Sequence, residues 1–207
     1  VLPVKPLLWG HTSGRTGEYD YKWCPITSGS WEEIEKSSFA MFAFASCKRR
    51  GEVRIRLNDK MLYGAAPVPY ATGLLARYAW SRILEYLPAL DEAEALSFQE
   101  RGKQGVKQAL TKGLDFYQAL PSVIVTVGER MGQGGKKDIK ALLGNPRLAA
   151  RILKGVIKSK LARRPMLPRD VWSPKGLIAG GSDASIYKER IREMWGRSPL
   201  DVYACTE

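Results

Sequence analysis

Apolar residues recur at helical spacing in several segments of the chain. A helix is predicted from Ser30 up to Gly51, because Ser30 and Glu33 have the spacing of a capping box. Apolar residues then follow at that spacing: Trp31, Ile34, Met41, Phe42 and Ala45. A second helix is predicted over residues 73–87, where Pro88 would stop it, and residues 104–114 also have a helical pattern.

Two shorter segments have the composition of buried strands. Residues 60–66 form an apolar run that is closed by Pro67 and Pro69, which predicts a strand. Residues 122–127 have the β-branched density of a strand, but Pro121 and Ser122 also suit the start of a helix. Propensity alone leaves the second segment open between strand and helix.

The C-terminal part of the chain predicts a βαβ unit. Residues 175–181 have the pattern of a buried strand that enters a glycine turn, and residues 200–204 alternate as a second strand. Between them, Ser182 or Asp183 can cap a helix that ends at Gly196. A strand, a helix and a strand in this order imply parallel pairing and covering helices. The predicted fold class is therefore α/β, with a mostly parallel sheet covered by helices.

Residues 147–161 predict an amphipathic helix with a basic face. Its apolar residues recur at four-residue steps: Leu148, Ile152 and Val156, and Ala149, Leu153, Ile157 and Leu161. Its basic residues line the other side: Arg147, Arg151, Lys154 and Lys158. The formal net charge of the chain is +12, and residues 136–164 hold ten Lys or Arg against Asp138 alone.

The basic stretch leaves three interpretations. A solvated helix face is the ordinary one, and attraction of an anionic partner stays open. Nucleic acid is not the expected partner, because residues 136–164 contain no aromatic side chain for base stacking and no recognised nucleic-acid motif.

Composition places the chain among ordinary globular proteins. The chain is 44% hydrophobic and 26% charged, which excludes an intrinsically disordered or collagen-like chain. Its 207 residues are enough for one domain. The apolar runs fall far short of the roughly 20 residues of a membrane span. The first residues also lack the apolar block of a signal peptide. We therefore expect a cytoplasmic protein without a membrane partner.

Cysteine and histidine exclude several kinds of site. Cys24, Cys47 and Cys205 have no paired spacing, so we expect reduced thiols and neither a disulfide framework nor a structural zinc site. His11 is the one histidine, so no site can use two histidines of this chain. Its place two residues before Ser13 invites a nucleophilic role, but the favoured interpretation is a loop residue beside a glycine-rich turn.

The densest group of chemically useful side chains follows His11. Glycine lets backbone N–H groups turn inward, while hydroxyls and a guanidinium add donors, so such a turn can wrap a polyphosphate. It is not a Walker loop, because the Gly-Lys-Ser/Thr sequence is missing, and a merely flexible turn is the alternative. The group comprises Thr12, Ser13, Gly14, Arg15, Thr16 and Gly17.

Three segments in order give this turn a context. Residues 12–17 resemble the Thr-Ser-Gly-Thr-Thr-Gly signature of the adenylate-forming superfamily, which includes acyl-CoA synthetases, luciferases and peptide-synthetase adenylation domains. Residues 203–207, Tyr-Ala-Cys-Thr-Glu, resemble its Tyr-Gly-x-Thr-Glu signature. Gly180, Gly181 and Ser182 stand where that superfamily has its adenine-binding glycine turn.

Further segments resemble one branch of the superfamily. Residues 22–27, Lys-Trp-Cys-Pro-Ile-Thr, are similar to the Lys-x-x-Pro-x-Thr stretch of auxin-responsive acyl-acid amido synthetases and their bacterial relatives, as are residues 65–75 and 121–129. This resemblance favours a helix over residues 122–130. Arg15 departs from the usual Thr, Ala204 from the common Gly, and Glu18 and Asp20 put acidic groups beside the turn.

The resemblance implies the central part of an ATP-dependent carboxylate-activating ligase, which forms an acyl-adenylate and transfers the acyl group to an amine such as an amino acid, or to the thiol of CoA. Residues 1–207 would be a partial nucleotide-binding core, without the hinge and the mobile C-terminal domain with its catalytic Lys, and inactive alone. A non-catalytic nucleotide-binding or anion-binding protein of the same fold and a basic nucleic-acid-binding module are the alternatives.

The resemblance also assigns roles to residues. Residues 12–17 would hold the β- and γ-phosphates with help from Lys22, and Gly180, Gly181, Ser182, Tyr203 and Ala204 would frame the adenine. Thr206 would bind the α-phosphate, and Glu207 would bind Mg²⁺, a cation that suits a carboxylate and phosphate oxygens.

Overall fold

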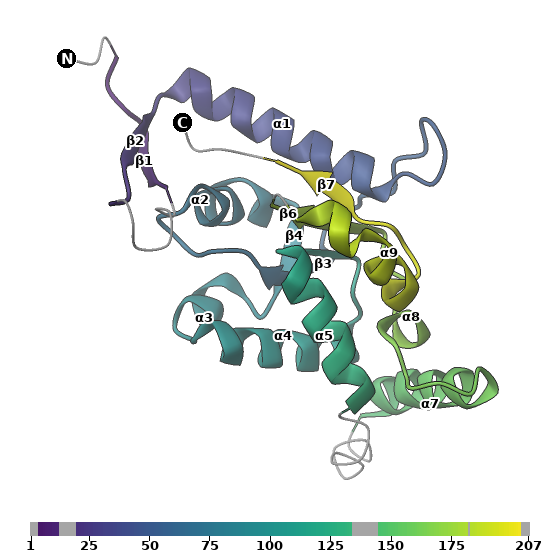
Figure 1. Ribbon diagram of the computed structural model, residues 1–207. Helices are drawn as coiled ribbons and strands as arrows, with labels where there is room; N and C mark the ends of the chain where they lie inside the picture. The colour runs from purple at the N-terminus through teal and green to yellow at the C-terminus, as the bar shows by residue number, and fades with distance from the viewer. Residues whose placement is uncertain (1–3, 13–19, 134–144, 182, 204–207) are drawn as a thin grey trace.

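A parallel β-sheet organises the protein (Figure 1). The computed structural model describes residues 4–12, 20–133, 145–181 and 183–203. Within these residues the sheet has five strands in the order β4-β3-β5-β6-β7. The strands are β3 (Asp59–Gly64), β4 (Leu84–Leu87), β5 (Phe116–Ala119), β6 (Gly176–Gly180) and β7 (Leu200–Val202). Every neighbouring pair is parallel, which confirms the predicted α/β class.

Helices cover both faces of the sheet because successive strand residues point to opposite sides. One face, with Met61, Tyr63 and Tyr86, packs against α1 and α2, and the other, with Leu62 and Leu87, against α4, α5 and α9. The helices on the first side are α1 (Ser28–Ser46), α2 (Ala71–Tyr78), the 3-10 turn η1 (Trp80–Arg82) and α3 (Leu90–Glu94). Those on the second side are α4 (Phe98–Lys112), α5 (Pro121–Gln133), α7 (Pro146–Leu161), α8 (Pro168–Val171) and α9 (Ala184–Trp195).

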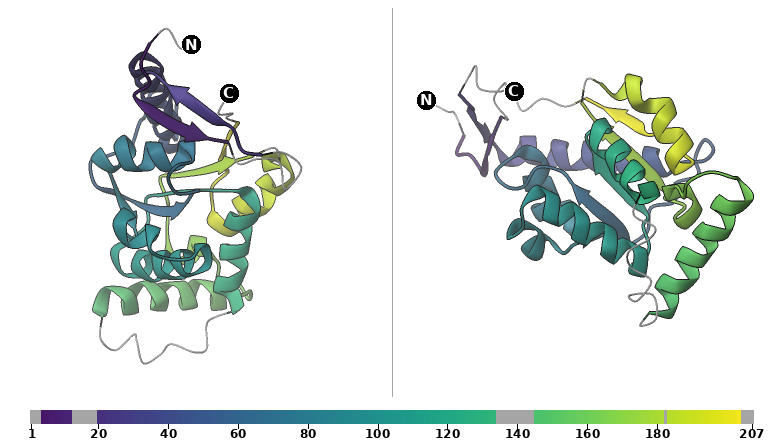
Figure 2. Two further views of the ribbon diagram at one scale, coloured as in Figure 1. Left: turned by 90° about the vertical axis from the view of Figure 1, so that its left-hand side faces the viewer. Right: turned by 60° about the horizontal axis from the view of Figure 1, so that its bottom comes forward.

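An antiparallel hairpin stands apart from the main sheet (Figure 2). Its strands β1 (Leu8–His11) and β2 (Trp23–Ile26) pair so that Gly10 lies opposite Cys24. The hairpin is joined to the segment between β3 and α2, because the His11 N–H donates to the Pro69 carbonyl over 3.3 Å and His11 bridges Tyr70. The base of the predicted phosphate turn, at the end of β1, is thus joined to the segment that follows β3.

Most predicted elements are confirmed, with shifted ends. Helix α1 begins at Ser28 rather than Ser30, because the Thr27 hydroxyl accepts the Ser30 N–H and so caps it. The predicted strand of residues 60–66 corresponds to β3. The predicted helix of residues 104–114 corresponds to α4, which begins earlier, at a capping box of Ser97 and Glu100, and ends at Lys112. The ambiguous segment 122–127 lies in helix α5, as the resemblance favoured.

The prediction of one helix over residues 73–87 is wrong. The helix α2 ends at Tyr78, and Leu84–Leu87 is the strand β4. Leu84, Tyr86 and Leu87 are almost completely buried, as expected for a strand covered on both faces. A short, continuously buried apolar run has no period that separates a strand from a buried helix, so the sequence pattern did not distinguish them.

The C-terminal βαβ unit is confirmed. Strands β6 and β7 pair in parallel with Ile178 opposite Leu200, and α9 connects them. The helix ends where Gly196 adopts φ +74°, a left-handed conformation that glycine adopts without the steric cost of a Cβ. Its Asp183 N-cap makes no side-chain capping hydrogen bond to the helix.

Helix α7 has the predicted position but not the predicted orientation. Its most buried residues are Gly155 and Ser159, while Leu153, Ile157 and Leu161 are exposed. Arg151, predicted on the solvated face, is half-buried instead, because its guanidinium donates to the Leu110 and Thr111 carbonyls at the end of α4 over 2.9 and 2.6 Å. Apolar spacing identified the helix, whereas small residues determine which side packs.

Candidate functional site

The carboxyl ends of the parallel strands form the edge where α/β proteins of this kind bind ligands. Gly180 ends β6 and Gly181 follows it with φ +129°, a conformation that favours glycine. The Gly181 N–H donates to the Val202 carbonyl at the end of β7 over 3.3 Å. Tyr203 comes next and is 82% exposed. Three residues assigned to the adenine site therefore lie together at this edge.

Two hydrogen bonds between Thr12 and Lys22 join the two ends of the predicted phosphate turn. The Thr12 N–H donates to the Lys22 carbonyl, and the Lys22 N–H donates to the Thr12 hydroxyl, each over 3.0 Å. These bonds extend the β1–β2 ladder to the base of the turn. The Thr12 hydroxyl thus closes the turn in addition to any contact with a phosphate.

The remaining residues of the predicted site lie outside the described residues, so the roles assigned to them stay predictions. They are Ser13, Gly14, Arg15, Thr16, Gly17, Ser182, Ala204, Thr206 and Glu207. The described residues next to them in the chain include Thr12 and Tyr203. Thr12 follows β1, which is hydrogen-bonded to the segment between β3 and α2. Tyr203 follows the end of β7.

His11 is a buried strand residue, which corrects its interpretation as a loop residue. It ends β1 and is 9% exposed, and its Nδ1 lies 2.8 Å from the Thr12 carbonyl oxygen. Its ring stacks on Tyr21 at 4.8 Å and meets Trp23 and Tyr70 edge-on at 5.1 and 4.4 Å. The ring therefore holds the hairpin against the segment before α2.

A buried polar cluster around Tyr63 was not predicted from the sequence. Tyr63 lies opposite Gln118 in the sheet and packs its ring edge-on against Tyr86 at 5.3 Å. The Arg101 guanidinium lies 5.0 Å from the centre of the Tyr63 ring and donates to the Ala65 carbonyl over 3.1 Å. Tyr63, Tyr86 and Gln118 each precede the last residue of their strand, so the cluster adjoins the carboxyl edge.

Three atoms of this cluster lack hydrogen-bond partners among the residues that the structure describes. They are the Tyr86 hydroxyl, Arg101 Nε and Gln118 Oε1. Burial, together with the nearby Tyr63, raises the pKa of Tyr86 well above its usual value, so the phenol keeps its proton as a donor. Buried polar atoms without partners are costly, and in native proteins a strained site, a catalytic role or a bound water or ion accounts for them. The cluster could not be predicted from the sequence, because each of these residues becomes a neighbour of Tyr63 only through the packing of the strands and of α4.

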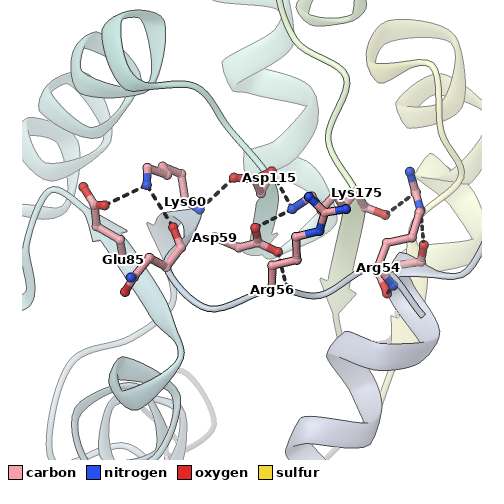
Figure 3. A network of polar contacts seen from close by, with 9 residues as sticks. Arg54, Arg56, Asp59, Lys60, Glu85, Asp115 and Lys175 are labelled. Atoms are coloured by element: carbon pink, nitrogen blue, oxygen red, sulfur yellow. Dashed lines mark hydrogen bonds and ion pairs between the residues drawn. The ribbon is translucent and has the colours of Figure 1, made fainter.

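A second polar network occupies the opposite, amino edge of the sheet (Figure 3). The Lys175 ammonium pairs with Asp59, and its Nζ lies 3.1 Å from Asp115 Oδ1. The other oxygens of these carboxylates accept the backbone N–H groups of Arg56 and Lys60 over 2.8 and 2.9 Å. This network satisfies its own charges and ties the starts of β3, β5 and β6 together, so its role is structural.

The described residues contain neither a metal-binding cluster nor a helix that could span a membrane. Over the described ranges, no three His, Cys, Asp or Glu residues gather in a way that could hold a metal ion. Glu207, the predicted magnesium ligand, lies outside those ranges. In the same part of the chain, no helix combines the length and hydropathy that a membrane span requires. Cys24 and Cys47 are free thiols, and Cys205 lies outside the described residues.

No family model matches the sequence, and no curated protein matches it. Among solved structures, one described as "Malonyl-CoA Ligase Ternary Product Complex with Methylmalonyl-CoA and AMP bound" aligns with 98% of this chain at 20% identity and a TM-score of 0.48. The chain spans 33% of the length of that protein. A likeness of this size gives the chain neither a family nor an activity.

Proposed function

We propose that this chain is the nucleotide-binding core of an ATP-dependent carboxylate-activating ligase. One observation supports the proposal: Thr12, Gly181 and Tyr203, the described residues at or next to the signature segments, follow strand ends on the carboxyl side of the fold although they are far apart in the chain. Thr12 follows β1, whose last residue is hydrogen-bonded to the segment after β3. The Gly180–Gly181 turn lies at the end of β6, and Tyr203 follows β7 (Figure 1). A nucleotide site built from both turns agrees with ligand binding at this edge.

The residues at the edge suit the parts of a nucleotide. Gly180 has nothing within 4 Å of the position that a Cβ would occupy, and Gly181 is exposed, so a planar base can approach this backbone closely. Backbone amides and hydroxyls of residues 12–17 would hold the phosphates, with Thr12 and Lys22 fixing the ends of the turn. Thr206 and Glu207 would face the α-phosphate and Mg²⁺.

The chain's own residues would work by positioning and by charge stabilisation. When bound, ATP supplies the phosphorus centre that activates the carboxylate, and Mg²⁺ offsets the phosphate charges. The buried cluster of Tyr86, Arg101 and Gln118 would hold a polar group of the carboxylic acid, which accounts for its unpartnered atoms. The acceptor would be an amine, such as an amino acid, or the thiol of CoA.

The test is carboxylate-dependent release of pyrophosphate from ATP by the intact protein. Replacing Gly14 by Val adds a branched Cβ where the turn must bring its backbone close to phosphate, so ATP affinity should fall at least tenfold. The matched control is Gly29→Val, because Gly29 lies at the exposed start of α1 with nothing within 4 Å of its Cβ position. Unchanged ATP affinity and pyrophosphate release in Gly14→Val would contradict the proposal.

The pyrophosphate assay distinguishes the proposed ligase from a non-catalytic alternative, and binding measurements distinguish it from a nucleic-acid-binding one. A non-catalytic binding protein with this fold would bind ATP but release no pyrophosphate with any carboxylic acid. Binding of nucleic acid that weakens steeply with salt, without binding of ATP, would instead indicate a basic nucleic-acid module.

A further inference from the structure

Helix α7 presents an apolar line to solvent. Leu153, Ile157 and Leu161 are 61%, 50% and 81% exposed, and their four-residue spacing places them in one row along the helix. The side that packs against the protein carries Gly155 and Ser159, each two residues from a member of the row. Two residues correspond to about 200° around an α-helix, so the apolar line points away from the protein.

The packed side of α7 holds the helix in this orientation. A Cβ on Gly155 would lie 2.8 Å from the Met166 sulfur and 3.0 Å from Val171 Cγ2, so the helix approaches α8 as closely as a glycine allows. The Arg151 guanidinium anchors the same side to the end of α4. The exposed row therefore belongs to the fixed orientation of the helix.

Cations flank the row on both sides. Helix α7 contains no Asp or Glu and five Lys or Arg, of which Arg151 is occupied by α4. Lys154 and Lys158 each follow a member of the row and lie on one flank, while Lys160 lies on the other. All three are exposed. The outward surface of α7 thus has an apolar centre and a cationic border.

We propose that α7 docks on an anionic lipid surface with Leu153, Ile157 and Leu161 inserted among the acyl chains. Helices that lie in the membrane interface bury an apolar stripe while Lys and Arg meet the anionic headgroups. The long Lys stems can follow the apolar row while the ammonium groups reach the phosphates. The expectation of no membrane partner rested on the absence of a spanning segment, and peripheral docking needs none.

The same features disfavour other occupants. Nucleic acid would place phosphates against the outward centre of the helix, where three apolar side chains stand and no aromatic residue is available for stacking. A second copy of α7 would bring two cationic borders together with no acidic residue in either helix to offset them. A lipid surface matches both the apolar centre and the cationic border.

The position of α7 permits such docking. All three views place α7 at the opposite end of the molecule from the β1–β2 hairpin (Figures 1 and 2). The carboxyl edge of the sheet therefore stays open to solvent when α7 lies on a surface. The proposal is independent of the proposed ligase activity.

The experiment is co-sedimentation of the intact protein with vesicles of phosphatidylcholine alone or mixed with phosphatidylglycerol. We expect binding to the mixed vesicles that weakens as salt is added, and little binding to phosphatidylcholine alone. Changing Lys154, Lys158 and Lys160 together to Gln should lower the partition coefficient on the order of a hundredfold, at roughly fivefold per charge.

The apolar row is tested separately. Changing Leu153, Ile157 and Leu161 together to Ser should lower partition into the mixed vesicles at least tenfold. The matched control is the pair Leu57→Ser and Ile186→Ser, which are 69% and 76% exposed and lie outside α7. Circular dichroism should show the same helix content in all variants, because each change is at an exposed side chain.

Three results would overturn the proposal. The first is the absence of binding to mixed vesicles, as when another part of the intact protein covers α7. The second is equal loss of vesicle binding in the control pair and in the α7 variant. The third is a concentration-dependent dimer, or an RNA complex, that is lost on changing the apolar row while vesicle binding persists.

Discussion

At the scale of single residues, Arg151 shows that a charge predicted to be solvated can belong to the fold. Its guanidinium donates to the two carbonyls at the end of α4, where the last turn of a helix lacks intrahelical partners. Arg151→Gln should lower the free energy of unfolding by about 1–2 kcal/mol in chemical denaturation. The control Lys154→Gln removes the charge of an exposed side chain and should change the free energy of unfolding by less than about 0.5 kcal/mol. Equal effects of the two changes would contradict the assignment.

Asp170 makes a second prediction at this scale. Burial raises the pKa of its carboxyl, but the Arg164 guanidinium, over 2.7 and 2.9 Å, and the Leu167 N–H, over 2.8 Å, outweigh burial and leave the pKa below its usual value. A lowered pKa in the folded state adds stability that is complete above the unfolded value, near pH 4, and is lost as the pH falls through the folded value.

The prediction compares wild-type protein with Asp170→Asn. The variant should be less stable at pH 7 by about 3 kcal/mol, because Arg164 loses a bidentate partner. The difference should shrink as the pH falls below about 4, where the wild-type carboxyl gains its proton. Urea denaturation at a series of pH values measures it, and a difference that does not change with pH would show that ionised Asp170 is not the stabilising group.

At the scale of elements, helix α4 offers a matched pair of glycines. A Cβ on Gly105 would lie 2.6 Å from both Leu62 Cδ1 and the Leu87 carbonyl oxygen, whereas Gly102 has nothing within 4 Å. Gly105→Ala should therefore destabilise the protein by about 1–3 kcal/mol. Gly102→Ala should stabilise it by about 0.5–1 kcal/mol through helix propensity. Melting temperatures that shift in the same direction would contradict this packing of α4 on β3 and β4.

The elements also show how far sequence reasoning extends. Capping residues and helical spacing predicted α1, α4 and α7, and the glycine turn of residues 180–181 predicted the βαβ unit. The strand β5 was missed because Phe116–Ala119 has no alternation and is buried on both faces. The hairpin strands were missed because their pairing depends on contact with the segment before α2, which local sequence does not encode.

The candidate site was predictable in part for a related reason. Short motifs and their resemblance to known signatures made Thr12, Gly180, Gly181 and Tyr203 candidates, since such motifs are local in sequence. The polar cluster of Tyr86, Arg101 and Gln118 depends on which strands are neighbours, and sheet order is a property of the whole fold. The orientation of α7 depends likewise on how closely Gly155 approaches α8.

At the scale of the whole molecule, the sheet has two edges with different tasks. At the amino edge, the Lys175 ammonium satisfies the carboxylates of Asp59 and Asp115, and Asp59 is 5% exposed. At the carboxyl edge, open space lies beside Gly180, and three buried polar atoms around Tyr63 lack hydrogen-bond partners among the described residues. This division predicts that variants at the two edges affect stability and activity separately.

The prediction compares Lys175→Met with Glu207→Gln in the intact protein. Lys175→Met leaves two neighbouring carboxylates without their cation and should cost about 3 kcal/mol of unfolding free energy, while ATP affinity stays within a few-fold of wild type. Adding Asp59→Asn should recover part of the loss, because the two residues are in contact.

Glu207→Gln removes a hard anionic ligand for Mg²⁺, so carboxylate-dependent pyrophosphate release should fall roughly a hundredfold, with unchanged stability. Urea denaturation and the pyrophosphate assay measure the two effects. A Glu207→Gln variant with the wild-type rate and magnesium dependence would show that the role assigned to Glu207 is wrong.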